Sequence, residues 1–383
     1  MIVAGLMSGT SSDGVDVAIV RLEGRGFQTR VKLLQHRAFT YERPVRRAVL
    51  SAMNARAARV ANLARLNFLL AEVYADAIRA TVADAGVRVE LIGCHGQTIY
   101  HQGESRPFLG RDIACTWQTG EGAILAARTG APVVSDFRPA DMAVLGTGAP
   151  LVPFLDYLLY RHPRHGRIVQ NIGGIANLTA IPPGASPEQV IAFDTGPGNM
   201  VMDALAERLF AKPFDRDGHL AARGEINQRL LAQMLRHPFF RRQPPKTAGR
   251  EEFGREYLVK LLRQAKGVKK EDLLATATAL TARSIAAAAT MFLGAGGGLG
   301  QQIFREFIVS GGGARNRTLM AMLREQLPGV KLHTSDDFGL PSEAKEAVAF
   351  AVLAYQTWHR LPSNIPAATG AERAAVLGKI SYP

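Results

Sequence analysis

The amino-acid sequence predicts an α/β protein made of two duplicated domains. The first observation is the length of 383 residues, since a domain usually contains about 100–200 residues. The second is a strand–turn–strand pattern with a tip of small residues, which occurs twice, about 160 residues apart. The third is the alternation of short apolar strands with helical patterns, which is typical of helices layered on mixed sheets.

The first half of the chain contains the first hairpin. An apolar strand at 2–7 and a strand at 15–21 flank a tip of small and polar residues at 8–14. Apolar residues then recur at helical spacing through 58–85. A short strand is expected to end at Ile92–Cys94, just before the next polar motif.

The second half repeats this pattern after a short strand at 132–136. Further strands are predicted at 167–170, 175–181, 190–193 and 307–309. Helices are predicted from about 200, at 219–235, 251–265 and 271–293, from about Asn316, and at 342–359. Asp215 is expected to cap the turn before Leu220.

The tip of the first hairpin, Ser8–Gly14, has the composition of a phosphate-binding turn. Glycine lets the backbone approach phosphate oxygens, and hydroxyls and amides donate hydrogen bonds to them. The tip lacks the lysine of a Walker P-loop, so that motif is excluded. Taken alone, the same residues also fit an ordinary polar hairpin turn.

Two further glycine turns follow strands, Asn171–Gly174 and Ser310–Asn316. The second is followed by a helix, so its N–H groups are candidates to face an anion or an adenosine. Each turn alone is weak evidence for a ligand. Three such turns after three strands, in register with a repeated domain, favour a nucleotide site over simple chain reversal.

Asp194 is the main catalytic candidate. It is predicted to end an apolar strand and to begin a glycine turn that opens a helix. Active sites in open α/β sheets lie at strand ends that face a crevice. A carboxylate there can accept a proton from an oxygen beside a transferring phosphoryl group. The alternative is a structural aspartate that caps the turn or the helix.

Several classes of function are not expected. The net charge of +13 suggests nucleic-acid binding, but the basic residues are spread along the chain rather than gathered on one element. Cys94 and Cys115, with His95 and His101, match no common zinc spacing. Two cysteines fit a reducing cytoplasm. No basic signal peptide opens the chain, and no apolar run reaches the roughly 20 residues of a membrane span.

Longer motifs give the sequence a specific family resemblance. The chain resembles the anhydro-N-acetylmuramic acid kinases, which are part of the sugar kinase/actin/heat-shock ATPase superfamily. The motifs that carry the resemblance are Gly5–Asp16, Cys94–Ile99, Asp136–Arg138, Gly148–Pro153, Asn171–Gly174, Phe193–Asn199, Lys246–Glu251 and Gly311–Gly313. They are distributed over essentially the whole chain.

The resemblance implies a fold and a reaction. The fold is actin/hexokinase-like, with domain I at 1–130 plus 342–383, domain II at 131–341, and ligands in the cleft between them. The reaction takes ATP, water and 1,6-anhydro-N-acetylmuramic acid to N-acetylmuramic acid 6-phosphate and ADP, in cell-wall recycling. Water would attack C1 of the sugar, with Asp194 taking its proton, and the freed O6 would attack the γ-phosphoryl group.

The resemblance and the glycine turns together give the expected site residues. The catalytic base is Asp194. The residues expected to bind ATP are Gly9, Thr10, Ser11, Ser12, Asp13, Gly14, Val15 and Asp16 at the first tip, with Asn171, Gly173, Gly174, Gly311, Gly312, Gly313 and Asn316. The residues expected to bind the sugar are His95, Gln97, Thr98, Arg138 and Glu346. Mg²⁺ is expected with ATP, with Asp13 as a ligand through water.

One departure and several alternatives remain. Many relatives have an aromatic residue where this chain has Ala344, so the contacts of the sugar pocket are open. The alternatives are another small-sugar or small-acid kinase of the same fold, and a nucleotide-binding regulatory module. The expected setting is the cytoplasm, without nucleic-acid or membrane partners. The sequence leaves open whether the protein is a homodimer.

Overall fold

The chain forms two compact units in a computed structural model that describes residues 1–9, 12–293 and 303–383. Unit 1 contains Met1–Leu159 and Glu343–Pro383, and unit 2 contains Tyr160–Ser342. The first division falls later than the predicted boundary at 130/131. One reason is that β6 (Val133–Ser135) lies inside the sheet of unit 1, where it pairs with two other strands of that unit.

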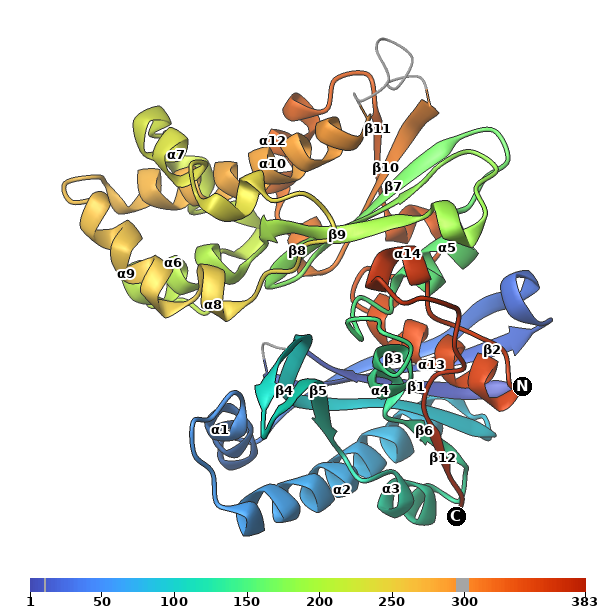
Figure 1. The fold of residues 1–383 in the computed structure, drawn as a ribbon. Coiled ribbons are helices and arrows are strands. Elements are labelled where there is room, and N and C mark those ends of the chain that lie inside the picture. The colour runs from blue at the N-terminus through green and yellow to red at the C-terminus, as the bar shows by residue number, and fades with distance from the viewer. Residues whose placement is uncertain (10–11, 294–302) are drawn as a thin grey trace. The chain divides into compact units, whose positions relative to one another are not determined.

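Unit 1 is built on a mixed sheet in the order β12-β6-β4-β1-β2-β3, with β5 paired to β4 (Figure 1). Its strands are β1 (Ile2–Ser8), β2 (Gly14–Glu23), β3 (Arg30–Thr40), β4 (Leu91–Phe108), β5 (Arg111–Thr119), β6 and β12 (Lys379–Ser381). β1, β2 and β3 form an antiparallel meander, and β4 and β6 run parallel to β1 on its other side.

Unit 2 repeats this arrangement in the order β11-β10-β7-β8-β9. Its strands are β7 (Gly166–Ile172), β8 (Ile175–Ile181), β9 (Ile191–Pro197), β10 (Phe304–Ser310) and β11 (Lys331–Thr334). β7, β8 and β9 form an antiparallel meander, and β10 and β11 are parallel to β7. The shared strand order confirms the predicted duplication of an α/β domain and its actin/hexokinase-like topology. The interdomain cleft stays a prediction.

The helices of unit 1 range in length from 26 residues to a single turn. They are α1 (Arg43–Ala52), α2 (Val60–Ala85), α3 (Gly122–Thr129), α4 (Phe137–Met142), α5 (Pro153–Tyr160), α13 (Lys345–Trp358) and α14 (Pro366–Thr369). α13 lies against the sheet where two strands carry glycine. A Cβ added at Gly5 would lie 1.9 Å from the carbonyl oxygen of Ala347, and one at Gly93 would lie 2.1 Å from that of Phe350. These glycines therefore set how closely α13 approaches β1 and β4.

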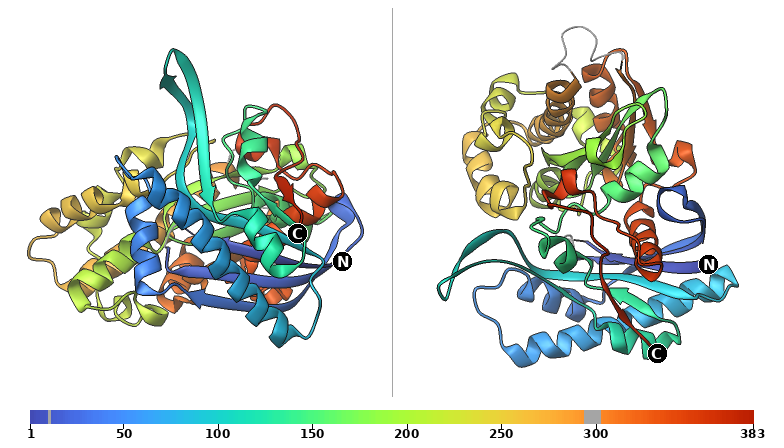
Figure 2. Two further views of the ribbon diagram at one scale, coloured as in Figure 1. Left: turned by 90° about the horizontal axis from the view of Figure 1, so that it is seen from below. Right: turned by 45° about the vertical axis from the view of Figure 1, so that its right-hand side comes forward.

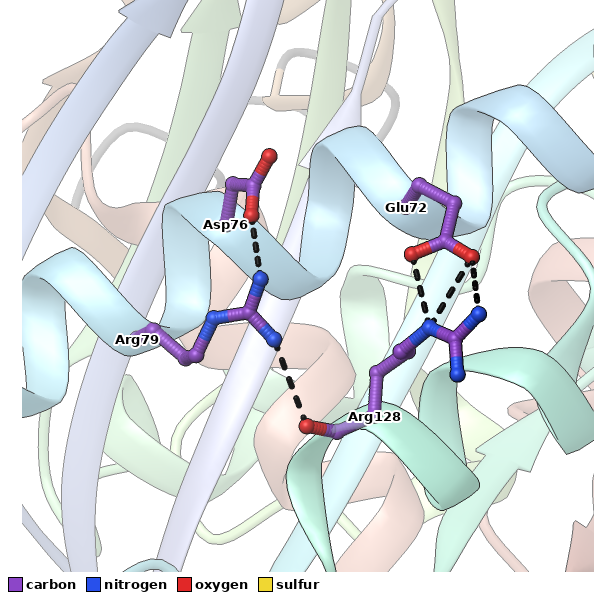
Figure 3. A network of polar contacts seen from close by, with 4 residues as sticks. All are labelled: Glu72, Asp76, Arg79 and Arg128. Carbon is purple, nitrogen blue, oxygen red and sulfur yellow. Dashed lines mark hydrogen bonds and ion pairs between the residues drawn. The ribbon is translucent and has the colours of Figure 1, made fainter.

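Helices α2 and α3 are joined by exposed ion pairs (Figure 3). Arg128 of α3 donates from Nε to both carboxylate oxygens of Glu72 on α2, each at 2.9 Å. Arg79 pairs with Asp76 one turn away and donates to the backbone oxygen of Arg128. The hydrogen bond from Arg128 holds the pKa of Glu72 below its ordinary value. Exposed pairs of this kind fix orientation more than they add stability.

Unit 2 has its own helices and apolar core. The helices are α6 (Met200–Phe210), α7 (Gln228–Met234), α8 (Arg250–Phe253), α9 (Arg255–Gln264), α10 (Lys270–Leu293) and α12 (Arg317–Gln326). The described part of α10 at Lys270–Thr290 is long and apolar enough to cross a membrane, which corrects the expectation that no segment reaches that length. However, 83% of its apolar window is buried, as in the core helix of a globular unit.

Three predicted elements differ from the observed ones. β4 does not end at Cys94 but runs on to Phe108, and with β5 it forms a long hairpin that extends beyond the other strands of its sheet (Figure 2). β9 likewise continues through Asp194 to Pro197. The helix predicted at 219–235 is broken into a 3-10 turn, Ala221–Arg223, and α7. As predicted, Asp215 caps this region, accepting from the backbone N–H groups of Leu220 and Ala221 at 2.8 and 2.9 Å.

Candidate active site

The first glycine turn connects β1 to β2 in unit 1. Gly14 closes it and lies against β3, since an added Cβ would be 2.0 Å from the carbonyl oxygen of Phe39. Ser12 is fully buried and has φ of 55°, a conformation that is uncommon outside glycine and frequent at functional turns. The predicted ATP contacts Thr10 and Ser11 lie outside the described residues.

Gln97 supports this turn from β4. It is fully buried, its Oε1 lies 2.6 Å from Ser8 Oγ, and its Nε2 donates to the carbonyl oxygen of Gly9 at 3.2 Å. Ser8 Oγ also lies 2.7 Å from the hydroxyl of Tyr41. Both ends of the Gln97 amide are therefore used to hold the turn. This favours a supporting role over the predicted contact with sugar.

The other predicted residues of this region have distinct surroundings. Asp13 is exposed at the turn. Val15 packs its side chain into the core. The Asp16 carboxylate lies 3.1 Å from His36 Nε2. Both residues would therefore contact a ligand mainly through their backbone atoms. Thr98 is half-buried, and its hydroxyl accepts from Gln118 at 3.2 Å.

His95 and Arg138 form a buried pair in unit 1. Arg138 points Nε and Nη2 at His95 Nε2, at 3.1 and 2.8 Å, while His95 Nδ1 lies 2.7 Å from the carbonyl oxygen of Gly96. Because a guanidinium only donates, His95 Nε2 must be the acceptor and the ring proton must be on Nδ1. Burial, and then the charge of Arg138, holds the pKa of His95 well below its ordinary value, so the ring is neutral.

Arg138 is also held through the loop that follows α4. Its Nη1 donates to the carbonyl oxygen of Gly148 at 2.7 Å, and the N–H of Gly148 donates to Asp141 Oδ2 at 2.8 Å. Asp141 is fully buried, and its Oδ1 accepts from Asn364 and Thr369, each at 2.7 Å. Asp141 could not be picked out from the sequence, because its side-chain partners Asn364 and Thr369 lie more than 200 residues further along the chain.

Glu346 stands near the guanidinium of Arg138. It lies in the first turn of α13 and is partly exposed. Burial lowers the pKa of Arg138 to about 10, and the carboxylates of Glu346 and Asp141 oppose that shift. Next to Glu346, Lys345 Nζ lies 2.7 Å from Asp156 Oδ1 in a buried ion pair that fixes the first turn of α13 on α5. Unit 1 thus brings together three of the five predicted sugar residues, His95, Arg138 and Glu346.

Unit 2 brings its glycine turns to one place. Gly173 and Gly174 accept backbone hydrogen bonds from 198–200, and a Cβ on Gly198 would lie 2.2 Å from the carbonyl oxygen of Gly173. A Cβ on Gly311 would lie 2.6 Å from Asn171 Oδ1, and one on Gly313 would lie 2.3 Å from Ile172. The turns at 171–174, 197–199 and 311–313 therefore form one cluster, which we call the glycine cluster.

The two asparagines predicted to bind ATP have structural tasks in this cluster. The side-chain oxygen of Asn171 lies next to Gly311, and Asn171 is almost fully buried. Asn316 caps α12 by accepting from the backbone N–H of Leu319 at 2.9 Å. Asn199, which belongs to the Phe193–Asn199 motif but was not among the expected ATP-binding residues, donates from its side chain to the carbonyl oxygen of Ile172 at 3.1 Å.

Asp194 lies on β9, three residues before the glycine cluster. Its Oδ2 accepts from the backbone N–H of Ala248 at 2.7 Å, and its own N–H donates to the carbonyl oxygen of Lys246 at 3.0 Å. The pKa of Asp194 is raised to about 7, chiefly by burial. The charge of Glu251 adds to this rise, while the hydrogen bond from Ala248 and the charge of Lys246 oppose it. A carboxyl with this proton affinity can act as a base near neutral pH. It does not cap α6, whose N-cap is Asn199.

Within the described part of the chain, no all-protein metal site accompanies these residues. Among residues 1–9, 12–293 and 303–383, no group of three His, Cys, Asp or Glu side chains is placed to hold a metal ion. Cys94 is buried and Cys115 is exposed, on different parts of the β4–β5 hairpin.

A family model and the curated relatives point to the same protein family. The family model for anhydro-N-acetylmuramic acid kinase matches residues 1–383. An anhydro-N-acetylmuramic acid kinase of Caldanaerobacter subterraneus subsp. tengcongensis is 45% identical over 387 residues, covering 99% of this chain and 96% of the relative. One from Bacillus cereus is 44% identical over 388 residues, with complete coverage of both chains.

Solved structures are more distant. An activator of 2-hydroxyisocaproyl-CoA dehydratase from Clostridium difficile has 10% identity and a TM-score of 0.47, covering 93% of this chain and 94% of its own. A ROK family glucokinase from Streptomyces griseus has 14% identity and a TM-score of 0.40, covering 93% of this chain and all of its own. At these scores neither likeness supports an argument about this protein.

Proposed function

Because the chain belongs to the anhydro-N-acetylmuramic acid kinase family, we propose that it opens 1,6-anhydro-N-acetylmuramic acid with water and phosphorylates O6 from ATP. The products are N-acetylmuramic acid 6-phosphate and ADP. The observation that carries the proposal is Asp194, a carboxyl with a pKa of about 7 on the strand that leads into the glycine cluster. A nucleotide-binding module has no need of a base at that position.

The phosphates of ATP are assigned to the glycine turns. Backbone N–H groups in such turns bind anions without a side-chain charge. The glycine cluster of unit 2 and, in unit 1, the described end of the first turn at Gly14 both bring backbone into close contact. Mg²⁺ would neutralise the phosphate charge, and the exposed Asp13 fits it, since Mg²⁺ in kinases takes one or two carboxylates, water and phosphate oxygens.

The sugar is assigned to the buried group in unit 1. Arg138 keeps its positive charge near neutral pH, because its pKa stays at about 10 despite burial. Two of its five N–H groups face His95 and one faces Gly148, so others are left for a sugar oxygen or a carboxylate. Glu346 supplies an acceptor beside it. Sugars are typically held by such mixed donors and acceptors.

The bond changes can be written with one base. Asp194 takes a proton from water, and the water oxygen forms a bond to C1. The C1–O6 bond breaks, O6 forms a bond to the γ-phosphorus, and the bond from that phosphorus to ADP breaks. The substrate has no free 6-hydroxyl, so the base acts on water rather than on the sugar. Positioning and charge stabilisation account for most of the catalysis of phosphoryl transfer.

The setting follows from this chemistry. ATP and the recycling of cell-wall fragments indicate the cytoplasm, and the partners are small molecules rather than nucleic acid or membrane. A different small-sugar or small-acid kinase would share the glycine turns and Asp194 but would phosphorylate an existing hydroxyl.

The test is ADP release with a panel of sugars. Wild-type protein is incubated with Mg·ATP and either 1,6-anhydro-N-acetylmuramic acid, N-acetylmuramic acid, N-acetylglucosamine or glucose. ADP release that depends on the anhydro sugar is expected, with N-acetylmuramic acid 6-phosphate as the product. Equal or faster turnover with a sugar that has a free 6-hydroxyl would favour the alternative kinase, and ATP binding without any turnover would favour a regulatory module.

A further inference from the structure

The segment that contacts Asp194 is Lys246–Glu251, which we call the strap. Its backbone holds the aspartate at two points, through the carbonyl oxygen of Lys246 and the N–H of Ala248. The second contact is short, at 2.7 Å, and goes directly to the carboxyl oxygen Oδ2. The strap comes from a loop far along the chain from β9, so its contact with Asp194 is a product of the tertiary fold.

The strap also carries two opposite charges that act electrostatically on the same carboxyl. Lys246 is only 8% exposed, and its ammonium lies over the rings of Phe239 and Phe193, at 4.8 and 5.7 Å from their centres. These contacts hold the ammonium beside β9 rather than in solvent. Glu251 folds back on the strap, since a Cβ on Gly249 would lie 2.4 Å from its carboxylate oxygen.

We propose that the strap is a positioning element for the catalytic base, with the Ala248 N–H aiming the carboxyl of Asp194 and with Lys246 and Glu251 setting its charge balance. The inference rests on the proposed function of Asp194 and adds to it the residues that make the base effective. Lys246 and Glu251 do not touch substrate in this account. They act through Asp194.

The two side chains have opposite expected effects. The Lys246 ammonium favours the charged form of Asp194, so removing the ammonium raises the pKa of Asp194. The Glu251 carboxylate disfavours the charged form, so removing the charge of Glu251 lowers that pKa. Two further neighbours are described: Asn177 stands opposite Asp194 on β8, and the charge of Arg242 acts on Lys246. Burial lowers the pKa of Lys246 itself, and Asp194 counteracts that shift.

The experiment compares four variants with the wild type. Lys246→Met keeps the aliphatic stem on Phe239 and removes the charge, and Lys246→Arg keeps the charge. Glu251→Gln removes the opposing charge. Lys266→Met is the matched control, because it makes the same change of net charge at an exposed lysine of unit 2. Two readouts are taken on the full chain: the pH dependence of kcat with Mg·ATP and the anhydro sugar, and a ¹³C NMR titration of the aspartate carboxyls, with Asp194→Asn identifying the signal of Asp194.

In Lys246→Met, kcat is expected to reach half its maximum at a pH about one unit higher than in the wild type. The rate then falls about 3–10-fold at pH 6.5 and recovers at pH 9. Glu251→Gln should move the midpoint to lower pH, while Lys246→Arg and Lys266→Met stay near the wild type. The NMR midpoints should move in the same directions. A loss in Lys246→Met that is equal at every pH, or unmoved NMR midpoints in both Lys246→Met and Glu251→Gln, would overturn the inference.

The two readouts separate this inference from the proposed function. If the wild type does not turn over the anhydro sugar, the proposed function fails. The NMR titration does not depend on turnover, so it still reports whether the strap controls the proton affinity of Asp194.

Discussion

At the scale of single residues, Asp194 combines properties that a structural aspartate does not need. Its carboxyl is held by one backbone N–H and keeps part of its surface accessible. Its pKa is raised to about 7, chiefly by burial, so both protonation states are populated near neutral pH. This is the range in which a general base is most effective. Turnover is therefore expected to rise with pH through about 7, as the carboxyl ionises.

Asp194→Asn should separate catalysis from binding. The amide keeps the size and still accepts from Ala248, but it cannot take a proton. We expect kcat to fall about 10²–10⁴-fold, the usual effect of losing a general base, with unchanged ATP affinity. Steady-state ADP release and calorimetric titration with an ATP analogue measure the two effects. Near-normal turnover would exclude Asp194 as the base.

The same substitution has an expected effect on stability. Between pH 4 and about 7 the folded protein binds more protons at Asp194 than the unfolded chain does, so this residue lowers stability as pH rises through that window. Asp194→Asn removes this effect and should be more stable than the wild type at pH 8 by about 2–4 kcal/mol. Urea unfolding at pH 4.5 and pH 8 measures it, with the exposed Asp112→Asn as control. No gain at pH 8 would contradict the raised pKa.

His95 is expected to act as a neutral acceptor that aims Arg138. His95→Gln keeps a hydrogen-bond acceptor for Arg138. His95→Phe keeps the ring contact with Phe350 but removes that acceptor. We expect His95→Phe to raise the KM for the sugar about 10-fold or more, since an unpaired buried guanidinium costs over 1 kcal/mol. The KM for ATP should stay constant in both variants. Equal KM values for the sugar in the two variants would show that His95 only packs.

At the scale of elements, α13 positions Glu346 because the strands beneath it carry glycine. A methyl group at Gly93 would overlap the carbonyl oxygen of Phe350 in the middle of α13. We expect Gly93→Ala to destabilise the protein by about 3 kcal/mol and to reduce sugar affinity through displacement of Glu346. Gly86→Ala is the control, since it has open space around it and costs about 1–2 kcal/mol for its left-handed backbone. Equal losses in urea unfolding would contradict this role of Gly93.

Much of the element order could be predicted because its signals are local. The two hairpins, α2 and α10 follow from apolar periodicity and from small-residue tips. The β4–β5 hairpin could not be predicted, because its outer part is polar and exposed and its pairing is interrupted by register shifts. The residues that hold Arg138 in place could not be predicted for a different reason. Asp141 is 223 residues from Asn364, and such a contact leaves no pattern in the sequence.

At the scale of the whole molecule, each unit carries only part of the proposed machinery. Unit 1 holds the Gly9–Gly14 turn and the Arg138 group, and unit 2 holds the glycine cluster and Asp194. Under the proposed function one ATP and one sugar would engage both sets of residues, so we expect ligands to draw the units together. Small-angle scattering should show a smaller radius of gyration with an ATP analogue and the anhydro sugar than with either alone. An unchanged radius with both bound would argue against closure.

In the proposed reaction, water opens the anhydro bridge and O6 receives the phosphoryl group. Turnover in ¹⁸O-labelled water tests it most directly, with the position of the label in the product read by mass spectrometry and ³¹P NMR. We expect one labelled oxygen at C1 of N-acetylmuramic acid 6-phosphate and none in its phosphate group. Label in the phosphate group, or a product without label at C1, would contradict it.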